Sequence, residues 1–255
     1  MQSQNIITRF KNAYHRFTHK TDYDWYADDL KKFVQLGKQV DGKRFDFENI
    51  GIFPFRDDRT SNTAFDTHYI YHPAWAARVL SKLKPTKHVD ISSTLHFCSI
   101  VSAFVPVEFY DYRPALLQLS QLHSQSADLT KLLFKDDELE SVSCMHTVEH
   151  IGLGRYGDPL DPLGDVKAMK ELQRVVKKGG SLLFVTPVGR PKIAFNGHRI
   201  YSFEMIIESF DTLELKEFSL IPDNAMEIGM INDCDPSIVK EQEYGCGCFW
   251  FRKRD

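Results

Sequence analysis

Two apolar runs, separated by a loop and a helical pattern, constrain the fold of this chain more than any other feature. The first run covers residues 141–145 and leads into residues 146–150 (HTVEH), and the second covers residues 181–186. Between them, residues 165–176 carry apolar side chains at helical spacing before a Gly-Gly pair. Short apolar runs that alternate with helices predict a mostly parallel sheet covered on both faces.

The length and composition of the chain fit one α/β domain with an N-terminal extension. The 255 residues are 42% hydrophobic and 26% charged, which is enough for a sizeable core. Residues 1–65 alternate aromatic and charged side chains, and residues 24–40 can form an amphipathic helix with Trp25 and Phe33 on one face. We therefore predict an extension over residues 1–65, acting as a lid or packing segment, and a main domain over residues 66–255.

Charge and hydropathy disfavour several classes of partner. The net charge of −3 means that the chain lacks the overall positive charge typical of nucleic-acid-binding proteins. No stretch reaches the roughly 18 apolar residues of a membrane span, and residues 1–20 have no apolar stretch of signal-peptide length. The five cysteines are an odd number and scattered, as in a reducing compartment. We expect a cytoplasmic protein whose partner is neither nucleic acid nor a membrane.

The Cys246-Gly247-Cys248 segment raises the question of a metal site. It has no second Cys/His pair at zinc-finger spacing, and alternate positions of one strand explain the two cysteines. We therefore expect no metal site.

Apolar periodicity and turn residues place the other elements. Val107-Glu108-Phe109-Tyr110 is strand-like and ends in Asp111, and Pro114 is suited to open a helix. We also predict helices over residues 72–83, with Pro73 in the first turn, and 202–210, and strands over 88–91, 213–221 and 247–251.

Motifs of two other enzyme classes are missing. A nucleotide-binding oxidoreductase needs G-x-G-x-x-G after a strand, and no such turn follows Asp90. A hydrolase with a nucleophile elbow needs G-x-S-x-G, which the chain also lacks.

Several segments resemble methyltransferases. Residues 128–137, 146–151 (HTVEHI) and 171–180 (ELQRVVKKGG) resemble the type-11 class of small-molecule methyltransferases, with Lys178 where proline is usual. A closer resemblance, over roughly residues 65–250, is to the methyltransferase-like family called domain of unknown function 268. It is carried by residues 68–69 (HY), 75–78 (WAAR), 88–91 (HVDI), 110–114 (YDYRP) and 152–159 (GLGRYGDP).

The resemblance implies a Rossmann-like class I methyltransferase fold: a mostly parallel seven-stranded α/β sheet that binds S-adenosylmethionine at the carboxyl ends of its strands. Asp111 would then hold the ribose diol, because a carboxylate makes strong, oriented bonds to two hydroxyls. Asp128 would accept from the adenine amino group while Leu129 donates its backbone N–H, and Asp90 would orient the first loop. Ser92 and His146 complete the predicted cofactor wall.

Ser92 leaves a second interpretation open. The class usually places glycines after its first strand, because only glycine lets the backbone approach the ligand closely, and residues 90–96 (DISSTLH) contain none. The Ser92 hydroxyl could donate to the amino-acid end of the cofactor, or the side chain could block the site. A degenerate, non-catalytic binding or scaffold protein is therefore the alternative to an enzyme.

Methyl transfer to oxygen or nitrogen is an in-line displacement in which positioning supplies much of the rate and a base takes the acceptor's proton. The candidates for contact with the acceptor, or for the base, are His150, Tyr156, Asp158 and His198. Tyr156 and Asp158 lie in a glycine-rich loop that is long for an α/β connection. The association of the family with surface-polysaccharide loci implies a small-molecule or glycan-type acceptor.

Overall fold

The computed structural model describes residues 24–40, 44–47 and 49–254. Contacts divide the chain into two units, Met1–Ala64 and Phe65–Asp255, and each is described by itself. Within the described part of the chain, no helix combines the length and the apolar character needed to cross a membrane. The part of the predicted extension that covers residues 1–23 lies outside the described residues.

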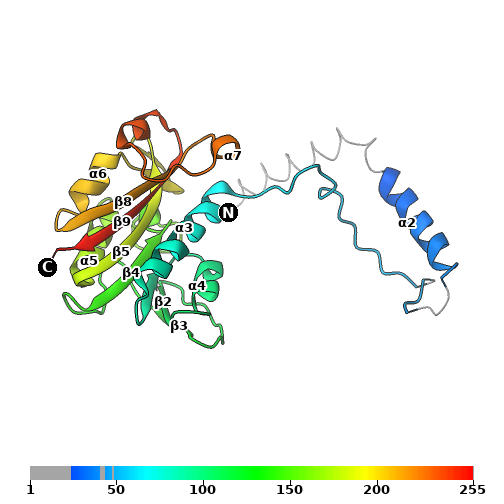
Figure 1. Cartoon of the computed structure of the whole chain (residues 1–255), viewed down its shortest axis with the longest axis horizontal. Coiled ribbons are helices and arrows are strands. Elements are labelled where there is room, and N and C mark those ends of the chain that lie inside the picture. The colour runs from blue at the N-terminus through cyan, green and yellow to red at the C-terminus, as the bar shows by residue number, and fades with distance from the viewer. Residues whose placement is uncertain (1–23, 41–43, 48, 255) are drawn as a thin grey trace. The chain divides into compact units, whose positions relative to one another are not determined.

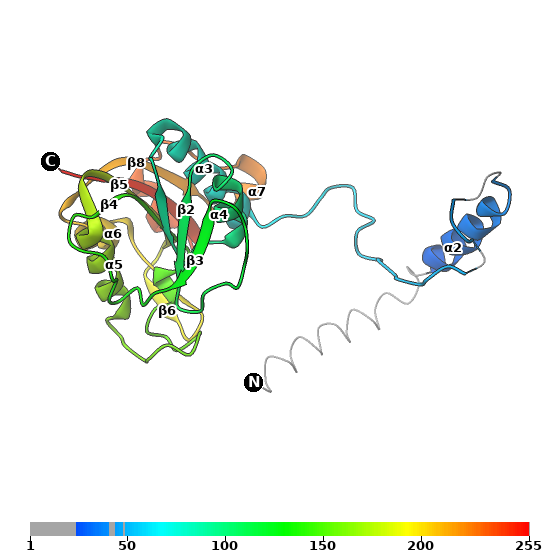
Figure 2. The ribbon, with the colours of Figure 1, turned by 90° about the horizontal axis from the view of Figure 1, so that it is seen from below.

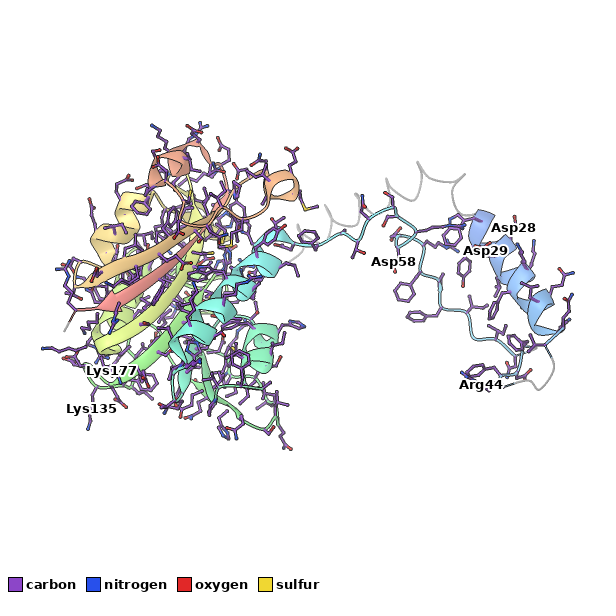
Figure 3. All side chains as sticks on the ribbon, viewed as in Figure 1. Asp28, Asp29, Arg44, Asp58, Lys135 and Lys177 are labelled. Carbon is purple, nitrogen blue, oxygen red and sulfur yellow. The ribbon has the colours of Figure 1, made fainter. Side chains whose placement is uncertain are left out.

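The first unit contains the predicted amphipathic helix, α2 (Asp24–Gly37). Asp29 accepts a hydrogen bond from the Arg59 guanidinium (3.2 Å), and that guanidinium also lies 4.6 Å from the centre of the Trp25 ring. Figure 3 labels Asp29 on this helix. Phe33 packs against Phe47, with 5.7 Å between ring centres. These contacts tie α2 to residues that follow it within the same unit.

The second unit is built on a seven-stranded sheet of order β3-β2-β1-β4-β5-β9-β8 (Figure 1). Neighbouring strands from β3 to β5 are parallel, and β9 is antiparallel to both β5 and β8. This arrangement confirms the predicted fold class. The strands are β1 (His88–Ile91), β2 (Val107–Asp111), β3 (Leu122–Ser126), β4 (Leu139–Met145), β5 (Val176–Val188), β8 (Leu213–Ile221) and β9 (Gly245–Lys253).

Helices cover both faces of this sheet (Figures 1 and 2). On one face, α3 (Thr67–Leu83) and α4 (Leu95–Val101) bury Trp75 and Phe97 against the sheet. On the other face, α5 (Gly164–Val175) and α6 (Phe203–Ser209) bury Leu172 and Ile206. The central strands are apolar on both faces for this reason. The remaining elements are η1 (Val148–His150), β6 (Lys192–Ala194), β7 (His198–Ile200), α7 (Ala225–Ile228) and η2 (Pro236–Glu241).

Helix α3 begins five residues before the predicted start. The Asp66 side chain accepts from the backbone N–H of Tyr69 (3.1 Å) and caps the helix at Thr67. Pro73 consequently lies inside the helix rather than in its first turn. The prediction was wrong because it gave the proline more weight than the Asp66 cap.

The segment after β2 also differs from the prediction. No helix follows Pro114 within residues 115–121, and the unpredicted edge strand β3 follows instead. Only its first residue, Leu122, is buried, so its sequence LHSQS shows no apolar alternation. Helix α4 was likewise not predicted, and Thr94 caps it by accepting from the backbone N–H of Phe97 (3.3 Å).

A buried polar chain crosses the centre of the sheet from β1 to β4. Fully buried His88 contacts the hydroxyls of Ser141 and Ser143 through its two ring nitrogens, each at 2.8 Å. Ser143 donates to the carboxyl group of Asp90, which also accepts from the backbone N–H of Ser93 (2.9 Å). Burial raises the pKa of Asp90 to about 6, although the hydrogen bonds from Ser143 and Ser93 oppose this rise.

The raised pKa of Asp90 predicts a pH-dependent contribution to stability. Because the folded state holds this proton more tightly than the unfolded chain does, the contribution is full below pH 4 and is lost as the pH rises through about 6. The shift of about two units corresponds to about 3 kcal/mol. Relative to wild type, the free energy of unfolding of Asp90→Asn should therefore increase between pH 4 and pH 7, as measured by urea unfolding.

The matched control for this experiment is Asp211→Asn, since Asp211 is exposed. Its free energy of unfolding should follow that of wild type across the same pH range. A difference between wild type and Asp90→Asn that stays constant with pH would contradict the prediction.

Candidate functional site

The first loop of the sheet is tied to the ends of both neighbouring strands. Ser92 has a φ of 58°, a left-handed conformation that favours glycine. Its backbone N–H donates to the carbonyl of Tyr110 (2.7 Å), and its hydroxyl lies 3.2 Å from the same oxygen. The Ser92 carbonyl accepts from the hydroxyl of Thr147 (2.9 Å). The serine thus adopts the backbone conformation of the missing glycine.

A pocket lies at the carboxyl ends of the parallel strands. It encloses about 620 Å³ of space, part of which is open to solvent. Its walls include Ser92 after β1, Asp128 and Leu129 after β3, and Tyr156 and Asp158 from the loop after β4. The structure therefore brings together predicted cofactor residues and predicted acceptor residues from positions as distant as 92 and 158.

Three predicted cofactor residues are not part of this wall. Asp90 is fully buried beneath the first loop. Asp111 ends β2 beside the lining residue Tyr112, and its carboxylate accepts from the backbone N–H of Arg113 (2.7 Å). His146 belongs to a neighbouring cluster of histidines described below. The roles in cofactor binding given to these residues stay predictions.

The loop over residues 151–164 is shaped by its own hydrogen bonds. One oxygen of Asp158 accepts from Gly152 N (2.7 Å) and the other from Tyr156 N (3.2 Å). Gly152 has a φ of 79°, and a Cβ atom there would lie 2.0 Å from the carbonyl oxygen of Asp161. Both carboxylate oxygens of Asp158 are thus engaged within the loop, which favours an organising role over that of a base.

The ring of Tyr156 lies between two cations. The guanidinium of Arg113 is 4.5 Å from the ring centre and that of Arg155 is 5.2 Å from it. Arg155 also donates to the carbonyl of Gly197 (3.0 Å). Two guanidinium groups therefore lie against the ring of a pocket-lining residue, since an aromatic face attracts cations.

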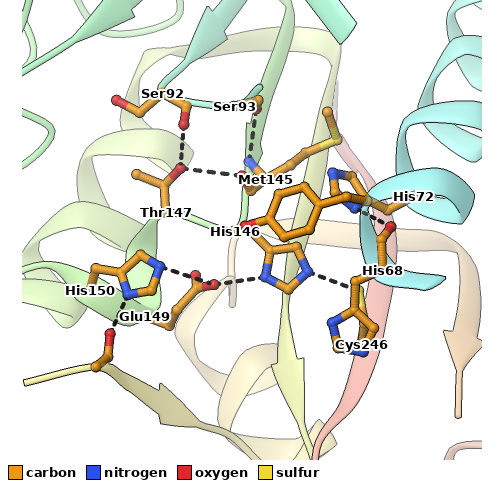
Figure 4. A network of polar contacts seen from close by, with 12 residues as sticks. His68, His72, Ser92, Ser93, Met145, His146, Thr147, Glu149, His150 and Cys246 are labelled. Atoms are coloured by element: carbon orange, nitrogen blue, oxygen red, sulfur yellow. Dashed lines mark hydrogen bonds and ion pairs between the residues drawn. The ribbon is translucent and has the colours of Figure 1, made fainter. Parts of the chain in front are cut away.

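Glu149 lies at the centre of a histidine cluster next to the pocket (Figure 4). Its carboxylate is 2.8 Å from Nδ1 of His146 and 3.8 Å from Nε2 of His150. His150 Nδ1 lies 2.6 Å from the carbonyl of Gly197 and 3.2 Å from the Arg155 guanidinium. The His150 ring packs edge-on against Tyr156, 5.7 Å between centres.

Burial and charge set the pKa values in this cluster. Burial lowers the pKa of His150. Burial also lowers the pKa of His68, to about 4. Burial also acts to lower the pKa of His146, but its contacts with Cys246 and Glu149 outweigh this effect and raise it to about 10. His198 is half-buried 4.8 Å from the Tyr244 ring, and burial lowers its pKa. The rings of His68, His150 and His198 are therefore neutral at neutral pH.

Sequence reasoning missed two members of the cluster. His68 lies in the first turn of α3, and Cys246 in β9 contacts His146 with 3.3 Å between Sγ and Nε2. Both residues lie in segments already noted in the sequence, residues 68–69 and 246–248. The spacing of residues along the chain does not predict that α3, the end of β4 and β9 lie close together. The antiparallel pairing of β9 with β5 brings them together.

Comparisons with known proteins agree with this fold. Residues 119–232 match the model of the family described as "Caenorhabditis protein of unknown function, DUF268", which confirms the predicted resemblance. No curated protein matches the chain.

Solved structures agree as well. One is a proposed sarcosine dimethylglycine methyltransferase from Galdieria sulphuraria, with 12% identity, a TM-score of 0.51, and coverage of 72% of this chain and 85% of that one. Another is a chain from the complex between the Haloferax volcanii Trm112 methyltransferase activator and a proposed methyltransferase, with 15% identity, a TM-score of 0.50, and coverage of 74% and 90%. At these identities the likeness establishes the fold, which is that of class I methyltransferases.

The shape of the 151–164 loop predicts unequal effects of two glycine substitutions. Gly152→Ala adds a backbone clash with Asp161 to the strain of a positive φ, whereas Gly157→Ala, at φ 85°, meets no atom within 4 Å. We expect Gly157→Ala to lower the free energy of unfolding by about 1 kcal/mol and Gly152→Ala by about 3 kcal/mol or more. Urea unfolding of both variants checks this, and equal losses would contradict it.

Proposed function

Because the chain has the class I methyltransferase fold, we propose that it transfers a methyl group from S-adenosylmethionine to a small-molecule or glycan-type acceptor. The observation that carries the proposal is the pocket at the strand ends, whose walls join Ser92, Asp128 and Leu129 to Tyr156 and Asp158. Ligands of open α/β sheets bind in this position.

The residues around the pocket fit the proposed cofactor. Asp128 uses one carboxylate oxygen to accept from the N–H and hydroxyl of Thr130 (2.8 and 2.7 Å) and has a second oxygen for the adenine amino group. The N–H of Leu129 would donate to the adenine ring. Asp111 likewise uses one oxygen for Arg113 N, and its carboxylate would accept from the ribose hydroxyls.

Bound there, S-adenosylmethionine supplies an electrophilic methyl group for in-line displacement. We assign contact with the acceptor to Tyr156 and acceptance of its proton to His150, whose ring packs against Tyr156. The Glu149 carboxylate, 3.8 Å from Nε2 of His150, would stabilise the imidazolium that forms. Arg113 and Arg155 beside Tyr156 suit an acceptor that carries a carboxylate or phosphate group.

One observation favours the alternative of a binding protein without catalysis. Ser92 places a side chain at a left-handed position in the pocket wall, where glycine would leave more space for the cofactor. In this alternative, the protein has the same fold and pocket, but the Ser92 side chain prevents S-adenosylmethionine from binding.

Calorimetric titration with S-adenosylmethionine and S-adenosylhomocysteine tests the proposal. We expect wild type to bind both, and Asp111→Ala and Asp128→Ala to bind about 10–100-fold more weakly, since each loses a hydrogen bond to a charged group. Asp211→Ala is the matched control, because this exposed aspartate precedes β8 and is not part of the pocket wall. Its affinity should equal that of wild type.

Ser92→Gly separates the two interpretations. If the protein is an enzyme, this variant should bind S-adenosylhomocysteine within about threefold of wild type. If folded wild type fails to bind and Ser92→Gly gains affinity, the side chain blocks the site and the alternative holds. No binding by either protein would refute the cofactor proposal.

A further inference from the structure

Three side chains from distant parts of the sequence converge beside the proposed cofactor pocket. His68 comes from the first turn of α3, His146 from the end of β4, and Cys246 from β9. One ligand atom from each residue, a ring nitrogen or the sulfur, lies within 4.8 Å of the other two. Figure 4 shows His146 between Glu149 and Cys246. We propose that His68, His146 and Cys246 bind a Zn²⁺-class metal ion.

The donor set suits this metal. Zn²⁺ is bound by imidazole nitrogen and thiolate sulfur, and in a tetrahedral site such donors lie about 3.5 Å apart. The Cys246 sulfur and Nε2 of His146 are already 3.3 Å apart. The widest separation in the set, at most 4.8 Å, must shorten by about 1.3 Å to reach that spacing. On binding, the Cys246 thiol and the protonated His146 ring each release a proton to solvent, so that the thiolate and the Nε2 lone pair ligate the ion.

The surroundings of His146 match those of a metal-binding histidine. Its Nδ1 is held by the Glu149 carboxylate at 2.8 Å, so Nε2 is the nitrogen that faces Cys246. Metal-binding histidines commonly donate their other ring N–H to a carboxylate in this way, which fixes the ring and increases its basicity. Glu149 is buried, so water does not compete for this contact.

His72 gives a second, independent indication. Its Nδ1 lies 2.6 Å from the carbonyl of His68 and must donate to it, so Nε2 carries the lone pair. That nitrogen is buried and has no hydrogen-bond partner among the described residues. The ring stands edge-on to His146, 5.1 Å between centres. An unsatisfied buried nitrogen on a ring that contacts His146 is expected where side chains gather around a cation.

A thiol nucleophile is the rival explanation of the same contacts. Cys246, His146 and Glu149 follow the order of a nucleophile, base and orienting acid. Cys246 is fully buried, however, which denies a substrate the approach that nucleophilic attack requires. His68 is only partly buried and gives a small ion a path to the cluster. A metal site uses all three donors, whereas the nucleophile needs no ring nitrogen of His68, whose ring stacks on those of His146 and Tyr244.

The sequence analysis predicted no metal site because Cys246 and Cys248 lack a second ligand pair at finger spacing. The inferred site uses Cys246 alone, and its other ligands come from α3 and β4. Cys248, two residues further along β9 and equally buried, is therefore the matched control.

Titration of the full chain, first stripped with a chelator, with Co²⁺ and Zn²⁺ tests the site without any methyl donor. We expect one ion per chain and a thiolate-to-cobalt charge-transfer band that Zn²⁺ removes. Cys246→Ser should lose this band, and both Cys246→Ser and His68→Ala should bind at least about tenfold more weakly. Cys248→Ser should behave as wild type.

The proposal is overturned if wild type binds no stoichiometric metal, if Cys246→Ser keeps the band, or if Cys248→Ser loses it. His68→Ala changes a partly exposed helix residue, so it tests the site even if Cys246→Ser does not fold. Binding of S-adenosylhomocysteine is measured separately, and its outcome does not bear on the metal result.

Discussion

The buried carboxyl group of Asp90 is the interaction on which the functional end of the sheet depends. It accepts from Ser93 N on its own loop and from Ser143 on β4. Ser93 in turn accepts from the backbone N–H of Met145 through its hydroxyl (3.0 Å). These contacts fix the first loop against the end of β4, where the pocket and the histidine cluster meet. Burial raises the pKa of Asp90. Its hydrogen bonds hold in place the loop and the strand end that border the pocket and the histidine cluster.

The centre of the fold could be predicted from the sequence because its signals are local. The apolar runs of β4 and β5 and the helical spacing of α5 stand out, since buried parallel strands need apolar residues on both faces. The edge strand β3 carries no such signal, because one of its five residues is buried. The start of α3 was misplaced because an aspartate cap outweighed a proline.

The candidate site was predictable in part for a similar reason. Asp128, Leu129 and Tyr156 follow strands of a parallel sheet, and the carboxyl ends of such strands share one edge. The convergence of His68, His146 and Cys246 was not predictable, because it depends on one antiparallel strand returning along β5. The order and direction of the strands determine which residues lie together in such a cluster. The spacing of residues in the sequence does not indicate that order.

The hydrogen bond from Thr147 to the Ser92 carbonyl joins the two neighbouring sites through a single side chain. Thr147 follows His146 directly, and Ser92 forms part of the pocket wall. A displacement of the Thr147 backbone would therefore reach the pocket wall through one hydrogen bond. If occupancy of the pocket and of the histidine cluster is linked through this contact, each must change the affinity of the other by the same factor.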